Sequence, residues 1–231
     1  MNSKLIVALD FHQQEDALAL VNQLNPTQCA LKVGSEMFTL FGVHFIKQLI
    51  QKEFKIFLDL KFHDIPNTVA KACKACAELG VWMINVHASG GLTMMQAAKE
   101  AIASYGSLRP LLIAVTILTS LNQRDLLSIG IDHSLETQVE KLARLAHQAG
   151  LDGVVCSAHE VAAIKKACGN SFLTVTPGIR LSDSKKDDQS RTMTPSQAIA
   201  LGSDYLVVGR PITSSSDPVT IIDHINSAIS L

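Results

Sequence analysis

The sequence of 231 residues contains no long hydrophobic run. Near the N-terminus the apolar stretch covers only residues 5–9, which is too short for the core of a signal peptide or for a membrane-spanning helix. The chain also has no low-complexity tract and no break in composition that would separate two domains. We therefore expect a single domain, residues 1–231, located in the cytoplasm and without a membrane partner.

An excess of charge of either sign is also absent. The 20 Lys and Arg residues nearly balance the 21 Asp and Glu residues, which gives a formal net charge of −1. A general binder of nucleic acids or other polyanions needs a broadly basic surface. The composition therefore predicts no nucleic-acid partner, and any site for an anionic ligand must be a local concentration of Lys and Arg.

Cysteine is scarce, with five residues scattered along the chain, and an odd number of this kind does not indicate a disulfide framework. Cys73 and Cys76 form a C-x-x-C pattern, but their neighbours are typical of the interior of a helix. A redox-active pair normally lies at the start of a helix, and no second C-x-x-C is present to complete a zinc site. We predict buried helical cysteines at these positions and no metal centre.

Short apolar runs rich in β-branched residues alternate along the chain with longer amphipathic segments. The expected strands are residues 4–10, 29–34, 55–62, 82–88, 110–118, 153–157, 172–177 and 205–209, and the expected helices include residues 15–24, 44–52, 68–79, 93–104, 135–148 and 158–167. Nearly continuous apolar runs are typical of parallel strands that are buried on both faces. Eight βα units in a chain of this length predict an α/β fold, the closed (β/α)8 TIM barrel. The alternative is an open doubly wound sheet, although no G-x-G-x-x-G follows the first strand.

Charged residues gather where the expected strands end. The third strand carries Asp59 and Lys61, which share one face because their spacing is two, and Asp64 follows them. Asp10 ends the first strand, and Lys32 lies in the second. Taken singly, each could anchor a loop, and His87 and His63 are typical structural or surface histidines. As a set, however, Lys32, Asp59, Lys61 and Asp64 are expected to converge on one cavity, because the carboxyl ends of barrel strands share one face.

A second group of residues, at the ends of the last two strands, has the character of a phosphate site. Gly178 and Gly209 allow close approach of a ligand to the backbone, and Arg180 and Arg210 offer guanidinium contacts. Barrels often bind phosphate at this place. The polar segment 181–192 that lies between these two strands is expected to form either a solvated loop or a lid, with Gln189 as its contact to the ligand.

Residues 59–68, Asp-Leu-Lys-Phe-His-Asp-Ile-Pro-Asn-Thr, resemble the signature of the orotidine 5′-phosphate decarboxylase family. The likeness extends along the whole chain, through residues 8–10, 31–34, 176–180 and 208–213. It implies decarboxylation of orotidine 5′-monophosphate to UMP without a cofactor, the last step of de novo pyrimidine synthesis. It also implies a homodimer with its sites at the subunit interface.

The resemblance further implies a role for each matching residue. Lys61 would donate the proton to C6 of the pyrimidine, with Asp59 near the departing carboxylate and Lys32 in the charge network and on the ribose. Asp64 and Thr68 would reach the partner's site. The other residues expected at the substrate are Asp10, Leu60, Phe62, His63, Ile65, Pro66, Asn67, Thr119, Ser120, Pro177, Arg180, Gln189, Gly209 and Arg210.

Three other functions remain as alternatives. The first is a magnesium-dependent sugar-phosphate decarboxylase or aldolase of the same barrel superfamily, which shares the Asp-x-Lys-x-x-Asp core. Such relatives place an acidic metal ligand on the second strand, where this chain has Lys32. The second is a sugar-phosphate isomerase, which would leave the alternating charges of residues 59–64 unexplained. The third is a non-catalytic protein that binds a nucleotide phosphate, and it has no need of a buried Asp and Lys network.

Overall fold

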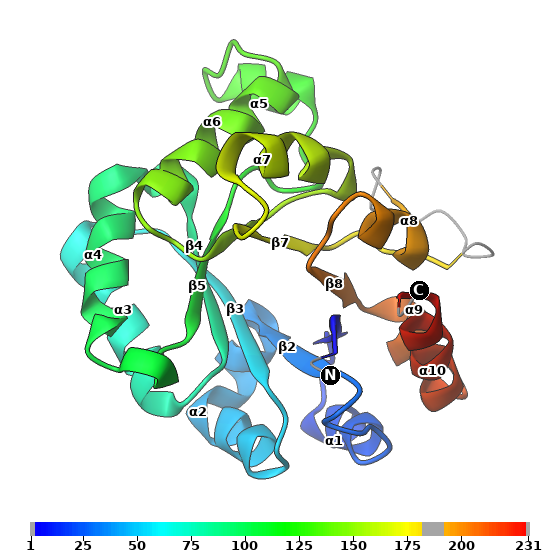
Figure 1. Ribbon diagram of the computed structural model, residues 1–231. Coiled ribbons are helices and arrows are strands. Elements are labelled where there is room, and N and C mark those ends of the chain that lie inside the picture. Colours follow the sequence, from blue (N-terminus) through cyan, green and yellow to red (C-terminus); the bar gives the residue numbers. More distant parts are fainter. Residues whose placement is uncertain (1–2, 182–191, 230–231) are drawn as a thin grey trace.

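A computed structural model describes residues 3–181 and 192–229, and in these residues eight parallel strands close into a barrel (Figure 1). The strands pair in sequence order, and β1 closes the barrel against β8. They are β1 (Leu5–Leu9), β2 (Ala30–Gly34), β3 (Ile56–Phe62), β4 (Met83–His87), β5 (Leu111–Val115), β6 (Gly153–Val155), β7 (Leu173–Thr176) and β8 (Tyr205–Val208). The predicted (β/α)8 barrel is confirmed, each strand lies within its expected range, and the open-sheet alternative is wrong.

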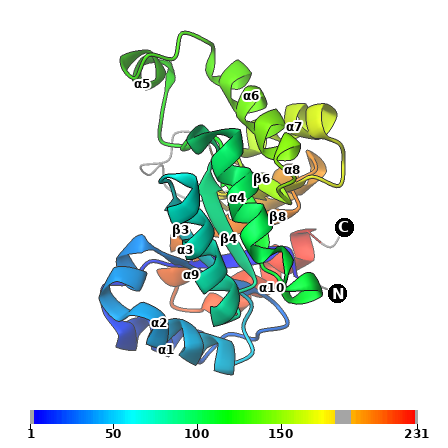
Figure 2. The ribbon, with the colours of Figure 1, turned by 90° about the vertical axis from the view of Figure 1, so that its left-hand side faces the viewer.

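Helices surround the barrel. They are α1 (Gln14–Val21), α2 (Ser35–Gln51), α3 (Pro66–Leu79), α4 (Gly91–Ala103), α5 (Gln123–Ser128), α6 (Leu135–Gln148), α7 (Val161–Cys168), α8 (Pro195–Ala200), α9 (Arg210–Thr213) and α10 (Pro218–Ile229), with 3-10 turns η1 (Ala88–Gly90), η2 (Gly106–Leu108) and η3 (Ala158–Glu160). Figure 2 shows α3 and α4 packed side by side outside β3 and β4, with α5 at the end of the molecule remote from α1 and α2.

The six expected helices are present, although several boundaries differ. The segment 44–52 corresponds to the second half of α2, a helix that Gly42 interrupts with φ of 60°. Helices α5, α8, α9 and α10 were not expected. The first three have only four to six residues, too few for a helical period to be recognised.

Two hydrophobic cores follow from the alternation of side chains along the strands. The interior of the barrel holds a compact cluster: Ile6, Ala8, Ala30, Phe57, Met83, Ile113, Val175 and Val207. The other strand face packs against the helices and forms the larger core. Because both faces are apolar, the strands have nearly continuous hydrophobic sequences. The inward-facing series continues to the carboxyl ends of the strands, where it becomes polar.

All five cysteines are free and buried, and burial had been predicted for two of them, Cys73 and Cys76. Burial raises the pKa of the Cys73 thiol to about 12 and that of Cys76 to about 11. Neither thiol is therefore ionised near neutral pH, which fits a packing role on α3. Among the described helices, none is long and apolar enough to cross a bilayer.

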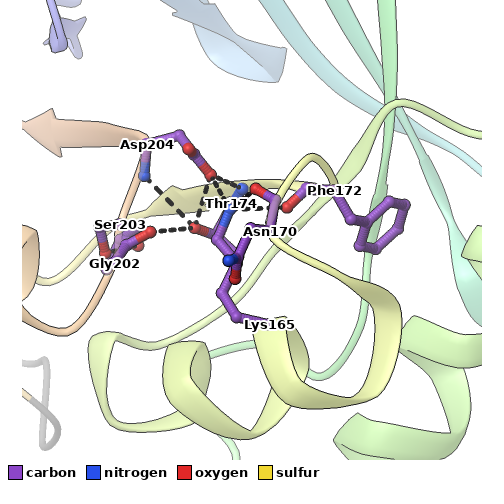
Figure 3. Close-up of polar contacts among 8 residues, drawn as sticks. Lys165, Asn170, Phe172, Thr174, Gly202, Ser203 and Asp204 are labelled. Carbon is purple, nitrogen blue, oxygen red and sulfur yellow. Dashed lines mark hydrogen bonds and ion pairs between the residues drawn. The ribbon is translucent and has the colours of Figure 1, made fainter.

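Polar side chains at the amino ends of the strands tie neighbouring strands together. Asp204, just before β8, accepts hydrogen bonds from Lys165 Nζ (2.6 Å) and from the backbone N–H (2.7 Å) and hydroxyl (3.0 Å) of Thr174 in β7 (Figure 3). Asp152, just before β6, has an equivalent position. Its carboxylate accepts hydrogen bonds from the backbone N–H of Leu112 in β5 and from the guanidinium of Arg109. These contacts satisfy buried polar groups at the end of the barrel opposite the strand carboxyl ends.

We expect Asp204→Ala to lower the free energy of unfolding by about 2–4 kcal/mol, because it leaves the largely buried Lys165 ammonium and the Thr174 N–H without their shared acceptor. Urea unfolding measured by circular dichroism tests this. Glu100→Ala, on the exposed face of α4, is the matched control and should change stability by less than about 0.5 kcal/mol. Equal stabilities of the two variants would contradict a structural role for this cluster.

Candidate active site

The carboxyl ends of the strands enclose a cavity of about 260 Å³. Ten residues expected from the sequence line it: Asp10, Lys32, Asp59, Lys61, Thr119, Pro177, Gly178, Arg180, Gly209 and Arg210. The rest of its lining is mainly apolar and comes from the same inward-facing series as the interior core, including Ala8, Phe57, Val155 and Val207. The cavity is therefore the open, polar end of the barrel interior.

Asp59 lies at the centre of a charge network in this cavity. Its Oδ1 accepts a hydrogen bond from Lys61 Nζ at 2.8 Å, and its Oδ2 lies 3.5 Å from Lys32 Nζ. Lys32 Nζ in turn donates to Asp10 Oδ1 at 3.3 Å. Asp59 is only 8% exposed, whereas Asp10 is exposed to solvent. Three neighbouring strands thus contribute alternating charges to one row.

The network is completed by Asn85 of β4, a fully buried residue that the sequence analysis missed. Its side-chain N–H donates to Asp59 Oδ1 at 2.6 Å, and its side-chain oxygen accepts from the backbone N–H of Lys61 at 2.8 Å. Lys61 has a φ of 52°, in the left-handed region that residues other than glycine seldom adopt. Asn85 therefore contacts both members of the Asp59 and Lys61 pair.

Two pKa values in the site are displaced from their ordinary ranges. Burial alone would raise the pKa of the Asp59 carboxyl, but Lys32, Lys61 and Asn85 outweigh it, and the pKa is lowered. Burial also lowers the pKa of His87, with smaller contributions from His63 and Lys61 that exceed the opposing effect of Asp59. The rings of His63 and His87 lie 5.5 Å apart between centroids. Asp59 is thus held as a carboxylate and His87 is biased toward the neutral form.

The second group of predicted residues lines the part of the cavity formed by β7 and β8. Arg180 Nη1 donates to the carbonyl of Ile179 at 2.9 Å, and its backbone N–H donates to the carbonyl of Met193 at 3.0 Å. The backbone N–H of Met193 donates a hydrogen bond to the carbonyl oxygen of Gly178. This short pairing fixes the chain on either side of the predicted lid. Gln189 and the rest of that segment, apart from its end residues Leu181 and Thr192, lie outside the described residues.

Several predicted residues do not line the cavity. Leu60 and Phe62 point to the opposite face of β3 and pack against the outer core, as strand alternation requires. The remaining ones are His63, Asp64, Ile65, Pro66, Asn67, Thr68 and Ser120. Asp64 was expected to converge with Lys32, Asp59 and Lys61, but within one chain it does not: the backbone turns outward after β3, and the exposed Asp64 carboxylate accepts from the N–H of Ile65 at 2.6 Å.

A signal for the missed apolar lining was present in the sequence. Ala8, Phe57 and Val207 each precede a predicted site residue by two positions, so they share its strand face. Asn85 likewise precedes His87 by two positions, but nothing in the sequence indicates which atoms of the neighbouring strand its side chain would contact.

A closed parallel barrel whose charged cavity lies at the carboxyl ends of its strands is the arrangement of (β/α)8-barrel enzymes. Within residues 3–181 and 192–229, no three His, Cys, Asp or Glu side chains are grouped so that they could hold a metal ion. The site therefore consists of ammonium, guanidinium and carboxylate groups on an apolar floor.

Comparisons with known proteins identify the family. Residues 3–225 match the family model described as orotidine 5′-phosphate decarboxylase / HUMPS family. The chain is 64% identical to the orotidine 5′-phosphate decarboxylase of Legionella pneumophila (strain Paris), over 96% of this chain and 97% of that protein. It is 58% identical to the enzyme of that name from Shewanella sediminis, over 100% and 99% of the two chains. The crystal structure of orotidine 5′-phosphate decarboxylase from Lactobacillus acidophilus superposes with a TM-score of 0.88 at 40% identity, covering 99% of this chain and 100% of that one. This chain belongs to the orotidine 5′-phosphate decarboxylase / HUMPS family.

The lowered pKa of Asp59 predicts a pH-dependent contribution to stability. Because the folded-state pKa lies below the unfolded one, the contribution is complete above about pH 5 and is lost as the pH falls through the folded-state value. The difference in unfolding free energy between the unmodified protein and Asp59→Asn should therefore be constant from pH 5 to 7 and shrink below about pH 4. Urea titrations between pH 2.5 and 7 measure it. Asp223→Asn on the surface of α10 controls for the loss of one charge, and parallel curves for the protein and Asp59→Asn would contradict the assignment.

Proposed function

We propose that this protein decarboxylates orotidine 5′-monophosphate to UMP and CO₂ in the cavity at the carboxyl ends of the strands, the last step of de novo pyrimidine synthesis. Family membership and the names of relatives that are 56–64% identical over nearly the whole chain support this reaction. The observation that carries the proposal is the buried Asp59 carboxylate held between Lys61 and Lys32 inside the cavity.

The charge of the cavity suits an anionic nucleotide. Four cationic side chains, Lys32, Lys61, Arg180 and Arg210, face the two carboxylates of Asp10 and Asp59, so the lining has a formal charge of +2. The substrate has a phosphate monoester at one end and a carboxylate on its pyrimidine at the other. Arg180 and Arg210, beside Gly178 and Gly209, suit the phosphate, whose oxygens match the planar donors of a guanidinium.

The remaining contacts follow from this orientation of the substrate. With the phosphate at β7 and β8, the ribose lies near Asp10 and Lys32, and the pyrimidine extends toward Asp59, Lys61 and Thr119. We assign Pro177 and the apolar lining to packing against the substrate, which keeps water from the base. Gln189 is assigned to the phosphate end only through the family signature.

The decarboxylation step is assigned to the pair of Asp59 and Lys61. Loss of CO₂ from C6 leaves an electron pair on that carbon, and no carbonyl lies beside the carboxylate to delocalise it. The Lys61 ammonium stabilises the developing charge and then transfers a proton from Nζ to C6. Asp59, near the departing carboxylate, favours the charged state of Lys61 and repels the substrate carboxylate before it leaves. After the transfer Lys61 is neutral until it takes up a proton from solvent.

Local electrostatics supply only part of the rate enhancement. A close charge pair at about 4 Å is worth roughly 4 kcal/mol at an effective dielectric constant near 20, before desolvation is counted. Enzymes lower barriers by roughly 8–23 kcal/mol. The rest of the barrier lowering comes from binding of the phosphate, because binding energy from a remote group can hold the pyrimidine against Asp59 and Lys61.

Neither a metal ion nor an organic cofactor is part of the proposal. A divalent cation at the Asp59 carboxylate would lie beside two ammonium groups, Lys32 Nζ and Lys61 Nζ, which disfavours the magnesium-dependent alternative. A non-catalytic phosphate-binding protein would not require a buried carboxylate with two lysines, since burial of charge is costly.

Lys61→Ala is expected to lower kcat by at least about 10³-fold, because it removes both the stabilising charge and the proton donor. The assay follows the absorbance of orotidine 5′-monophosphate in EDTA, with UMP identified by chromatography. The unmodified protein should be fully active in EDTA. Lys71→Ala, a surface lysine of α3, is the control and should retain activity. Substantial turnover by Lys61→Ala would contradict the assignment, and activity of the unmodified protein only on a sugar phosphate with added magnesium would contradict the proposed reaction.

The protein is further proposed to act as a homodimer, with Asp64 and Thr68 reaching the partner's cavity. Both are exposed and lie on the segment that follows β3, next to the cavity but outside it. Ile65, between them, is 67% exposed, an unusual position for a large apolar side chain that a subunit contact would cover. A carboxylate delivered by the partner would extend the alternating charges beyond Lys61.

As a small-molecule enzyme of nearly neutral charge, the protein is assigned to the cytoplasm.

A mixture of the Lys61→Ala and Asp64→Ala proteins should recover activity that neither has alone. In a mixed dimer one of the two sites has Lys61 from one subunit and Asp64 from the other, so random exchange should restore up to about a quarter of the activity of the unmodified protein. Exchange is followed with two differently tagged chains. If subunits exchange and activity does not recover, Asp64 does not act in the partner's site.

A further inference from the structure

The pairing of β3 with β4 is interrupted beside the charge network. Leu58 pairs with Ile84, and the next aligned pair is Phe62 with Val86. Three residues of β3, Asp59 to Lys61, therefore lie opposite a single residue of β4, Asn85. Such a bulge breaks the regular ladder of backbone hydrogen bonds and re-aims side chains. The two charged residues of the proposed chemistry lie within it.

The Asn85 side chain replaces the interrupted ladder. Its oxygen accepts the Lys61 N–H at 2.8 Å, and its nitrogen donates to Asp59 Oδ1 at 2.6 Å. Lys61 Nζ donates to the same Asp59 oxygen at 2.8 Å. One amide thus links the backbone of Lys61 to the carboxylate that its own side chain contacts. Asn85 is completely buried and does not line the cavity.

We propose that Asn85 is a positioning residue, which holds the bulge of β3 so that Asp59 and Lys61 stand in the geometry that the reaction needs. The inference rests on the proposed decarboxylase function and extends it to a residue that has no contact with the substrate. A positive φ at Lys61 is unfavourable for a residue with a side chain, so the conformation depends on specific contacts. The hydrogen bond from its N–H to Asn85 is the contact that holds it.

Only a side-chain amide of this length performs both functions. Leucine is similar in size but has no polar atom, and serine is too short to span the Lys61 N–H and the Asp59 carboxylate together. An aspartate would accept from Lys61 but place a second carboxylate against Asp59. The donation from Asn85 also stabilises the charged form of Asp59. The other groups that bear on the Asp59 charge are Lys32 of β2, Lys61 of β3, His87 of β4 and, through Lys32, Asp10 beyond β1.

The test compares Asn85→Leu with a matched variant, Thr174→Val. Thr174 is also a fully buried polar residue of a barrel strand that donates to a carboxylate, Asp204, but at the opposite end of the barrel (Figure 3). Asn85→Leu removes two buried hydrogen bonds, and Thr174→Val removes the one from its hydroxyl to Asp204, so both variants should be less stable than the unmodified protein. Steady-state kinetics with orotidine 5′-monophosphate then separate a loss of stability from a loss of positioning.

We expect Asn85→Leu to lower kcat by roughly 10²-fold, because a misplacement of about 1 Å has effects of this size. KM should change by less than about threefold, since the phosphate end is intact. Thr174→Val should leave kcat and KM unchanged within about twofold.

The inference is overturned if kcat of Asn85→Leu falls no further than that of Thr174→Val, or if the loss lies wholly in KM. Should Asn85→Leu fail to fold, Asn85→Ser is judged by the same two readouts, because it keeps a small polar group that reaches only one partner. An inactive unmodified protein would reject the proposed function itself, whereas an active one with unaffected Asn85 variants would reject only the role of Asn85.

Discussion

The arrangement of the site depends on keeping one buried carboxylate ionised. Asp59 is almost inaccessible to water, and burial by itself would favour its neutral form. Two ammonium groups and a buried amide reverse that preference. Removing any one donor leaves a charge in a poorly solvated place, which is costly. Lys32, Lys61 and Asn85 are therefore constrained together, and each comes from a different strand, so the network exists only when β2, β3 and β4 are paired.

The two ends of the barrel use charged residues for different purposes. At the amino ends, Asp152 and Asp204 accept backbone N–H groups of the preceding strands and pair with basic side chains, which fixes strand alignment. At the carboxyl ends, Asp59 and its lysines face a cavity. Between them lies a layer of apolar side chains in the barrel interior. This layer separates the structural charges from those assigned to chemistry, so the site can hold strained geometry, such as the left-handed Lys61, on a rigid base.

The cavity has two chemically different sides. Guanidinium groups line its β7 and β8 side, and alternating charges line its β1 to β3 side, which the proposed function assigns to the phosphate and to the reacting base. In the proposed reaction these are coupled, because energy from the remote phosphate holds the pyrimidine against Asp59. Asp64, by contrast, is exposed on the surface of the single chain and does not line the cavity.

The architecture and most of the charged residues of the cavity could be predicted from the sequence. Continuous apolar runs ending in charged residues are sufficient to predict eight buried parallel strands, and the i, i+2 spacing places Asp59 and Lys61 on one face. The sequence could not assign Asn85, which lies between two apolar residues of β4 and acquires its partners only through the shifted pairing of β3 with β4. Nor could it show that Asp64 turns away from its own cavity, since that follows from the backbone path after Lys61. Spacing along a strand fixes the face of a side chain, whereas its partner on the next strand depends on register, which is set when the strands pair in the folded chain.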